Sequence, residues 1–318
     1  MNSHFDATEV NAKFIEMMGS GGDMQKEAAQ GLQTYLKAQI YEDSFFERIV
    51  PAKSITPEQC DRNPDDIGFQ YVVDKEYTDV GAVASNFRGL GNYRYVETPR
   101  YAIPFHRISS DEMEMDEDEI RALRQPITQI IRHRTAYELR KQMDKEFIGQ
   151  VNYAIGLDAA NQSKSIAEST ITPEVVRVLR NILDSRGSVD GKYLRAATIL
   201  MTRSQYNAIP TWIQSNLVGG PNTGVGSAGG IGPDFWRDGY SYDKLFGLRV
   251  VVTDKSDLVA DNEIYVFPEP EYLGHHLTLG DDRFMIEKRF TRYKWKGVRT
   301  FAFAIGNAYG CGKVTLTG

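Results

Sequence analysis

The residues most able to bind a metal ion or act as a nucleophile are five histidines and two cysteines. Cys60 and Cys311 lie far apart, and neither has a partner at the spacing of a zinc site. His275 and His276 are adjacent, so on a strand their side chains would point to opposite faces. We therefore expect no metal, no cofactor and no catalytic residue here.

Two glycine-containing segments resemble phosphate-binding motifs. Gly224, Gly226 and Gly229 have the G-x-G-x-x-G spacing, but this motif needs a strand before it and a helix after it, and here it lies inside a glycine-rich loop. The stretch AYGCGKV resembles the end of a P-loop, yet Val314 replaces the hydroxyl residue that would bind a metal ion. We expect neither segment to bind a nucleotide.

Carboxylates are dense between residues 111 and 119, where seven of nine residues are Asp or Glu. Acid–base catalysis needs one buried group with a tuned pKa, so this density argues against a catalytic role. Ser109 and Glu112 have the spacing of a capping box, which predicts a helix that begins here with its acids at the positive end of the helix dipole. The run is then either a solvated helix start or a charged subunit interface.

The basic counterpart lies near the C-terminus, with seven Lys or Arg residues and one acid between residues 283 and 299. On a strand, Arg292, Lys294 and Lys296 would share one face, while Tyr293 and Trp295 would share the other. Aromatic rings on the opposite face cannot form a stacking platform for single-stranded nucleic acid. Two interpretations remain, weak phosphate contact or pairing with the acidic helix start of a neighbouring subunit, and we favour the second.

Two helices are expected in the N-terminal half. The first runs from Asp23 to about Tyr41 and is either a detachable arm or the opening helix of a globular domain. In the arm interpretation, residues 1 to 45 contribute little to the core. The second helix, from about residue 116 to 155, would be ~60 Å long, and Pro126 should kink or split it. A helix of this length predicts an elongated subunit.

The segment from residue 67 to 107 has the composition of β structure, interrupted by a long connection. We expect residues 71–73 to pair with residues 93–96 as an extended hairpin. The connection, residues 76 to 92, is a clasp on another subunit, an enzyme lid or a floppy tip. Its apolar residues, which we select as inter-subunit contact candidates, are Val80, Val83, Phe87 and Leu90.

Residues 171 to 280 predict a mixed α/β unit. A helix opens at Thr172-Pro173, AATILM is a buried strand, and SQYNAIPTWIQ is a short helix. LRVVVTD and EIYVFPE are further strands, and the tail adds two more, FTRYKWKG and VRTFAFAIG.

The composition is that of a globular protein: 318 residues, 41% hydrophobic, 25% charged and a net charge of -6. Disorder is excluded, and no overall positive field exists to hold nucleic acid. We find no signal peptide and no run of 18 apolar residues, and we expect a soluble intracellular product.

In this order the parts resemble the major capsid protein of tailed phages, the Hong Kong 97 fold. The resemblance covers nearly the whole chain and rests on layout rather than on one motif. It is carried by ITQIIRHRTAYELRKQMDKEFIGQVN, ATILMTRSQYNAIPTWIQ, GLRVVVTDKSD, EIYVFPEPEYLG and FAFAIGNAYGCGKVTL. It implies an α+β fold with an N-terminal arm over residues 1–60 and an extended β-loop over 61–100. A peripheral domain with the spine helix would comprise 101–165 and 281–300, and a central α/β axial domain 166–280 and 301–318.

The resemblance also implies a function. The chain would be a structural protein, not an enzyme, that forms hexamers and pentamers of an icosahedral virion shell around double-stranded DNA, assembled in the host bacterial cytoplasm. Its partners would be a portal, a separate scaffold, decoration proteins and weakly contacted DNA. The scaffold is expected to be a separate protein, or absent, because the sequence shows no scaffold-like extension at its start. Further contact candidates at the charged segments are Asp116, Glu117, Arg292, Lys294 and Lys296. Rival classes are a hydrolase with a lid at 76–92 and a tail or baseplate protein.

Overall fold

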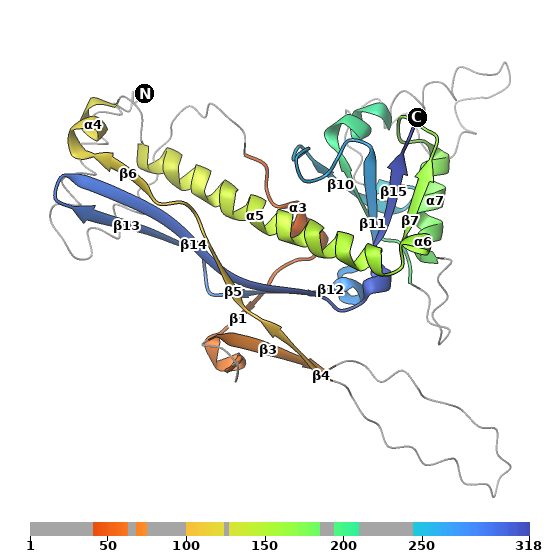
Figure 1. Ribbon diagram of the computed structural model, residues 1–318, viewed down its shortest axis with the longest axis horizontal. Coiled ribbons are helices and arrows are strands. Elements are labelled where there is room, and N and C mark those ends of the chain that lie inside the picture. The colour runs from red at the N-terminus through yellow and green to blue at the C-terminus, as the bar shows by residue number, and fades with distance from the viewer. Residues whose placement is uncertain (1–40, 63–67, 75–99, 124–126, 185–193, 210–243) are drawn as a thin grey trace, which may run out of the picture.

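The computed structural model describes residues 41–62, 68–74, 100–123, 127–184, 194–209 and 244–318. These residues form an elongated molecule (Figure 1). A long helix and a long curved sheet run side by side along its length, a mixed α/β unit lies at one end, and a small sheet lies below. The mixture of helices and sheets is the α+β class predicted from the sequence.

The long helix is α5 (Ile127–Leu157), with 31 residues and a length of ~46 Å. The short helix α4 (Glu117–Ala122) precedes it and ends at Leu123, whose backbone is extended, so residues 116–155 do not form one continuous helix. Pro126, where a kink or a split was expected, lies outside the described residues. Seven buried positions repeat every four residues along α5: Ile131, Thr135, Leu139, Met143, Phe147, Val151 and Ile155. This stripe is the face that packs on the long sheet and the α/β unit.

The long sheet is built around β14 (Arg292–Ile305). One edge of β14 pairs with β13 (Arg283–Arg289) and β12 (Gly274–Leu279), and β1 (Lys53–Ile55) adds to β12 in parallel. The other edge pairs with β5 (His106–Ser109) and β6 (Met113–Asp116). A Cβ at Gly297 would lie 2.2 Å from Cγ2 of Thr135, so glycine is what allows α5 to approach β14 this closely. The segments FTRYKWKG and VRTFAFAIG were expected to form two strands, and together they form the single strand β14.

The acidic run does not begin a helix at Ser109, which corrects the sequence-based prediction. Residues 113–116 are strand β6, and α4 begins at N-cap Asp116, whose capping-box partner is Glu119. The reason is an alternation of period two: Met113 and Met115 pack against the cluster of buried Tyr293 and Trp295, while Glu112 and Glu114 are exposed on the other face.

A three-stranded sheet consists of β2 (Asp61–Arg62), β3 (Phe69–Asp74) and β4 (Arg100–Pro104). The first predicted strand is correct, but its partner is not residues 93–96, because Tyr71 pairs with Ile103 and Val73 with Tyr101. Ile103 is buried beside Ile55 and fixes this register, since a shift by one residue would expose it. Residues 93–96 and the loop candidates Val80, Val83, Phe87 and Leu90 lie outside the described residues.

The α/β unit contains a six-stranded sheet in the order β7-β15-β11-β8-β10-β9. Its strands are β7 (Ser163–Ile166), β15 (Gly312–Leu316), β11 (Glu263–Phe267), β8 (Thr198–Thr202), β10 (Leu248–Thr253) and β9 (Lys244–Leu245). Helix α7 (Pro173–Asp184) packs on it through Val175, Leu179 and Ile182. The predicted helix after Thr172 and the three predicted strands are confirmed. Residues 203–209 are helical, and the motif glycines 224, 226 and 229 lie outside the described residues.

Short elements complete the connections: α3 (Phe45–Ile49), η1 (Pro57–Gln59), α6 (Ala159–Gln162), α10 (Pro270–Leu273) and η2 (Ala308–Gly310). Of residues 1–45, which were expected to contribute little to the core, Ser44 and Phe45 are buried, so the expectation is wrong at the end of that range. Phe45, Phe46 and Ile49 belong to the largest apolar cluster, together with Phe147 and Phe303. Of the earlier residues, 1–40 lie outside the described part of the chain.

Candidate assembly surface

The two charged segments singled out in the sequence meet at one end of the long sheet. Strand β6 lies antiparallel to the start of β14, with Glu114 opposite Lys294 and Asp116 opposite Arg292. Alternation along β14 buries Tyr293 and Trp295 and leaves the basic side chains facing outward, as predicted.

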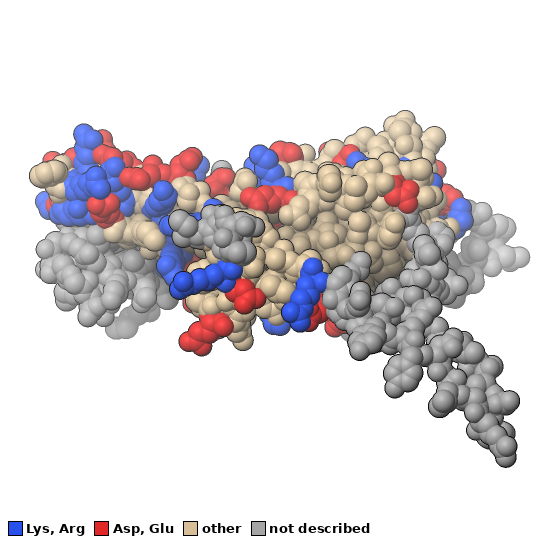
Figure 2. All heavy atoms as spheres, turned by 60° about the horizontal axis from the view of Figure 1, so that its bottom comes forward, with Lys and Arg blue, Asp and Glu red and all other residues tan. Residues whose placement is uncertain are grey.

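The basic and acidic side chains form a ladder of ion pairs. Lys294 Nζ lies 2.8 Å from Glu112 and 3.2 Å from Glu114, and Arg292 lies 2.8 Å from Glu114. Glu117 extends the ladder to β13, because its carboxylate lies 3.0 Å from Lys288. Glu117 also pairs with Arg121 within α4. In Figure 2 both signs of charge gather at this end of the molecule.

These contacts shift the ionisation of their members in the direction of mutual stabilisation. The hydrogen bond from Lys294 lowers the pKa of Glu112, and the charge of Lys296 lowers it further. The hydrogen bond from Arg292 lowers the pKa of Glu114, and the hydrogen bond to Glu112 raises the pKa of Lys294. The groups are therefore fully charged near neutral pH.

The ladder lies within one chain, which corrects our interpretation of the charged segments. The sequence correctly identified which segments pair but assigned the pairing to two subunits. In-chain partners occupy Asp116, Glu117, Arg292 and Lys294; the side chain of Asp116, for example, accepts a hydrogen bond of 2.9 Å from Thr291. A role of these residues and of Lys296 at a subunit interface stays a prediction.

A second polar cluster, which the sequence analysis missed, lies inside the molecule. Asp144 of α5 and Lys255 form an ion pair of 2.5 Å, and their side chains are 0% and 2% exposed. The same carboxylate accepts hydrogen bonds from the hydroxyl of Ser44 at 2.6 Å and from the backbone N–H of Phe46 at 3.0 Å. Burial raises the pKa of Asp144, and the charge of Lys255 opposes that shift.

The buried ion pair joins three parts of the molecule. Ser44 and Phe46 belong to the segment 42–50, which we call the strap; Asp144 belongs to the long helix, and Lys255 follows β10 of the α/β unit. No sequence signal links these residues, because Asp144 and Lys255 are 111 positions apart. The only indication was a carboxylate directly beside the apolar stripe of α5.

Other groups of the strap contact the long helix and the α/β unit, and also the long sheet. Glu42 accepts a hydrogen bond of 2.8 Å from the backbone of Asp254, and Asp43 pairs with Arg140 at 2.6 Å. Glu47 pairs with Arg299 of β14 at 2.6 Å. The backbone carbonyl of Val50 lies 3.1 Å from Nδ1 of His276, a buried residue of β12. The strap thus connects the long helix, the long sheet and the α/β unit.

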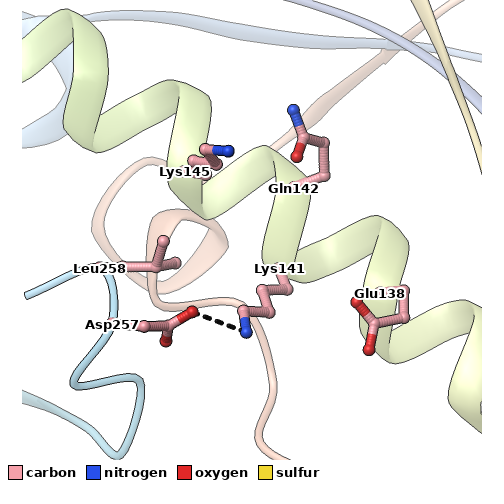
Figure 3. Close-up of a pocket in the computed structure, with 6 residues that line it drawn as sticks. All are labelled: Glu138, Lys141, Gln142, Lys145, Asp257 and Leu258. Atoms are coloured by element: carbon pink, nitrogen blue, oxygen red, sulfur yellow. Dashed lines mark ion pairs between the residues drawn. The ribbon is translucent and has the colours of Figure 1, made fainter.

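A hollow of about 320 Å³ lies between α5 and the loop that contains Asp257. Figure 3 shows Glu138, Lys141, Gln142 and Lys145 lining it from the helix, with Lys141 turned toward Asp257 at 2.7 Å. The hydrogen bond from Lys141 lowers the pKa of Asp257. A general base or acid needs a pKa near the working pH, so this shift runs against a catalytic role for Asp257.

The histidines, cysteines and carboxylates of the described residues form no recognisable metal or nucleophile site. In the described ranges, no group of three or more His, Cys, Asp or Glu residues is placed to hold a metal ion. Cys311 is buried, and burial raises its pKa to about 12, so its thiol is protonated at neutral pH. Among the described helices, none is long and apolar enough to span a membrane.

The arrangement was compared with known proteins. No family model and no curated protein sequence matches the chain. Solved structures do match. The Cyanophage Pam1 capsid asymmetric unit has a TM-score of 0.60 at 9% identity, over 91% of this chain and 96% of that chain. A structure from Microbacterium phage Oxtober96 has a TM-score of 0.59 at 11% identity, over 93% and 99%.

A third match is the mature capsid of bacteriophage PhiM1, with a TM-score of 0.55 at 12% identity over 91% of both chains. At these identities the likeness concerns the fold, and it extends over nearly the full length of each chain. The similarity therefore concerns the overall arrangement of the subunit and not one isolated part of it. The chain has the fold of phage capsid proteins, the Hong Kong 97 fold.

Proposed function

We propose that this chain is a structural major capsid protein, many copies of which form the icosahedral head that encloses phage double-stranded DNA. One observation carries the proposal: the structural match to the Cyanophage Pam1 capsid covers 91% of this chain and 96% of that one. A match of this extent involves the whole subunit and not a common motif.

The competing classes are less well supported. A hydrolase with a lid at 76–92 would need a pocket with a tuned acid or nucleophile, whereas Asp257 of the described hollow has a lowered pKa. A tail or baseplate protein would also assemble from many copies, but the Pam1 and PhiM1 structures that match this chain are capsids.

The proposal includes partners and place. The chain would form hexamers and pentamers of itself, with a portal, a separate scaffold and decoration proteins as further partners, and only weak contact with DNA. It would reside in the virion after assembly in the host cytoplasm. The division into an arm, a β-loop, a peripheral and an axial domain also stays a proposal, as do Val80, Val83, Phe87 and Leu90 as loop contacts.

Sedimentation velocity of the purified full-length protein tests the proposal. We expect discrete fast-sedimenting assemblies far above the 35.9 kDa subunit, in equilibrium with or derived from capsomers. A single monomeric species over the whole accessible concentration range, with or without hydrolase activity, would contradict it.

A further inference from the structure

A histidine lies buried where the strap meets the long sheet. The ring centre of His276 is 4.1 Å from that of Phe46 and 6.3 Å from that of Phe301, and α5 contributes the uncharged ring of Phe147 behind Phe46. Nδ1 of His276 lies 3.1 Å from the carbonyl oxygen of Val50. A carbonyl oxygen only accepts hydrogen bonds, so Nδ1 carries the proton of the neutral ring. We call the contact between strap residues 46–50 and His276 the seam.

The other nitrogen of the ring has no group to bind a second proton. Nε2 is buried and has no hydrogen-bond partner among the described residues. In the neutral ring Nε2 is an acceptor. A proton at Nε2 would create a buried donor and a buried positive charge together, and both are costly when they are unpaired. The closed seam therefore requires a neutral His276.

The charged groups packed around His276 do not remove this requirement. Burial lowers the pKa of His276 to about 4, and the charge of Arg299 on β14 lowers it further. The charge of Glu47 on α3 opposes the shift, but Glu47 already pairs with Arg299 at 2.6 Å. Lys53 of β1 acts on the neighbouring His275. A protonated His276 would thus lie near one cation, with the nearby carboxylate already engaged.

Both flanks of the seam are held by contacts that respond differently to acid. On the N-terminal side, the strap binds the carboxylate of Asp144 through Ser44 and the N–H of Phe46. Burial raises the pKa of Asp144 and of Glu42, so for these two carboxyls a falling pH favours the closed form. On the C-terminal side, β1 pairs with β12 through its backbone, which does not titrate. Among these contacts, mild acid therefore weakens the seam.

We propose that the seam is an acid-operated latch, in which a proton on His276 releases residues 46–50 from the long sheet while residues 42–45 and β1 stay bound. The strap would then connect the long sheet less firmly to the long helix and the α/β unit. The inference does not rest on the proposed capsid function, because it concerns the single subunit. A failure of assembly would leave it intact.

The size of the effect follows from the coupling of protonation to opening. In the open seam the pKa of His276 returns to its ordinary value of 6.5, whereas in the closed seam it is about 4. The ratio of open to closed subunits should therefore rise about fourfold from pH 7.5 to pH 6, and about thirtyfold from pH 7.5 to pH 5. Carboxylates with ordinary pKa values near 4 would act mainly below about pH 5.

Hydrogen exchange of the full-length, unassembled subunit, followed by mass spectrometry of its peptides, measures this ratio. Exchange rates are divided by those of an unstructured chain at the same pH. Peptides that contain Val50, whose N–H donates a hydrogen bond of 2.8 Å to the carbonyl of Phe46, should lose protection by the factors above. Peptides from α7 and β11 should change by less than about twofold. Unchanged protection of the seam at pH 5, or an equal loss in α7 and β11, would overturn the proposal.

Two histidine variants assign the effect to one side chain. His276→Gln should keep the protection of the seam nearly constant from pH 7.5 to pH 5, because the amide gains no proton. His275→Gln, on the same strand, should keep the full change. If His276→Gln loosens the seam already at pH 7.5, its pH dependence still decides, since a remaining thirtyfold rise would contradict the latch. So would loss of the rise in His275→Gln, or a wild-type rise that begins only below pH 5.

Discussion

At the residue scale, the buried pair of Asp144 and Lys255 has the largest expected effect on stability. The Asp144 carboxylate accepts hydrogen bonds from three donors. The Lys255 ammonium also lies 5.6 Å from the ring centres of Phe45 and Tyr137. Removing one member leaves the other charge buried without its partner, which costs far more than the pair contributes as a whole.

Asp144→Ala should therefore lower the free energy of unfolding by about 3–5 kcal/mol, measured by urea denaturation. Replacing both residues, as in Asp144→Leu with Lys255→Met, should cost less than the sum of the two single changes. Arg203→Ala is the control, since its pair with Asp254 is more than half exposed and should contribute at most about 1 kcal/mol. Additive single effects would refute the coupling between Asp144 and Lys255.

His276 gives the subunit a specific response to acid. Its ring is 2% exposed, and burial lowers its pKa from 6.5 to about 4. The unfolded chain then binds a proton at a higher pH than the folded chain does. Stability from this residue is fully present above about pH 6.5 and is lost as the pH falls toward 4, by on the order of 3 kcal/mol.

Melting temperatures measured between pH 7 and pH 4 check this prediction. His276→Gln should flatten the decline, because the neutral amide has no proton to gain. The half-buried neighbour gives the control, and His275→Gln should keep most of the decline. An unchanged slope in His276→Gln would show that another group is responsible.

At the scale of elements, local patterns predicted the α/β unit well and the charged segments less well. Helix α7 and strands β8, β10 and β11 each follow from a continuous apolar pattern or a helix start in the sequence. Strand β6 was not predicted, because a dense run of acids is also typical of a helix start. The alternation of Glu112, Met113, Glu114 and Met115 is the pattern that indicates a strand. The register of β3 depends on the burial of Ile103 beside Ile55, a distant residue that no local pattern reveals.

The ladder between β6 and β14 leads to a prediction that distinguishes contacts within a chain from contacts between chains. Lys294→Glu places a like charge beside Glu112 and Glu114, which should lower the melting temperature of the subunit. Adding Glu112→Lys and Glu114→Lys to the same chain should restore most of the loss, because the opposite charges meet again.

Co-expression of the two variants distinguishes pairing within a chain from pairing between chains. Chains carrying only Lys294→Glu, mixed with chains carrying only the two Glu→Lys changes, should not recover, since each chain lacks its own partner charges. Recovery in the mixture would indicate that the charged segments pair between subunits, as we first inferred from the sequence. The effect should diminish at high salt, because exposed charges are screened.

At the scale of the whole molecule, the strap connects parts of the subunit that are distant in sequence. Residues 42–50 bind the long helix, the long sheet and the α/β unit through buried aromatic rings and polar contacts. The long helix alone extends ~46 Å. The sequence predicted this elongation from helix length, but it did not predict the strap, because its contacts join residues separated by about a hundred positions or more.

An elongated subunit whose parts are fixed to one another is suited to tiling a curved surface. In the proposed shell, the two ends of such a subunit would contact different neighbours. Symmetric closure of such contacts gives rings of defined number, and rings of five and six close a shell.

Electron microscopy of particles purified from cells that express the full chain tests this account most directly. We expect closed icosahedral shells in which every subunit lies flat in the wall with its long helix along the surface. Open tubes, isolated rings or a uniform population of single subunits would contradict it.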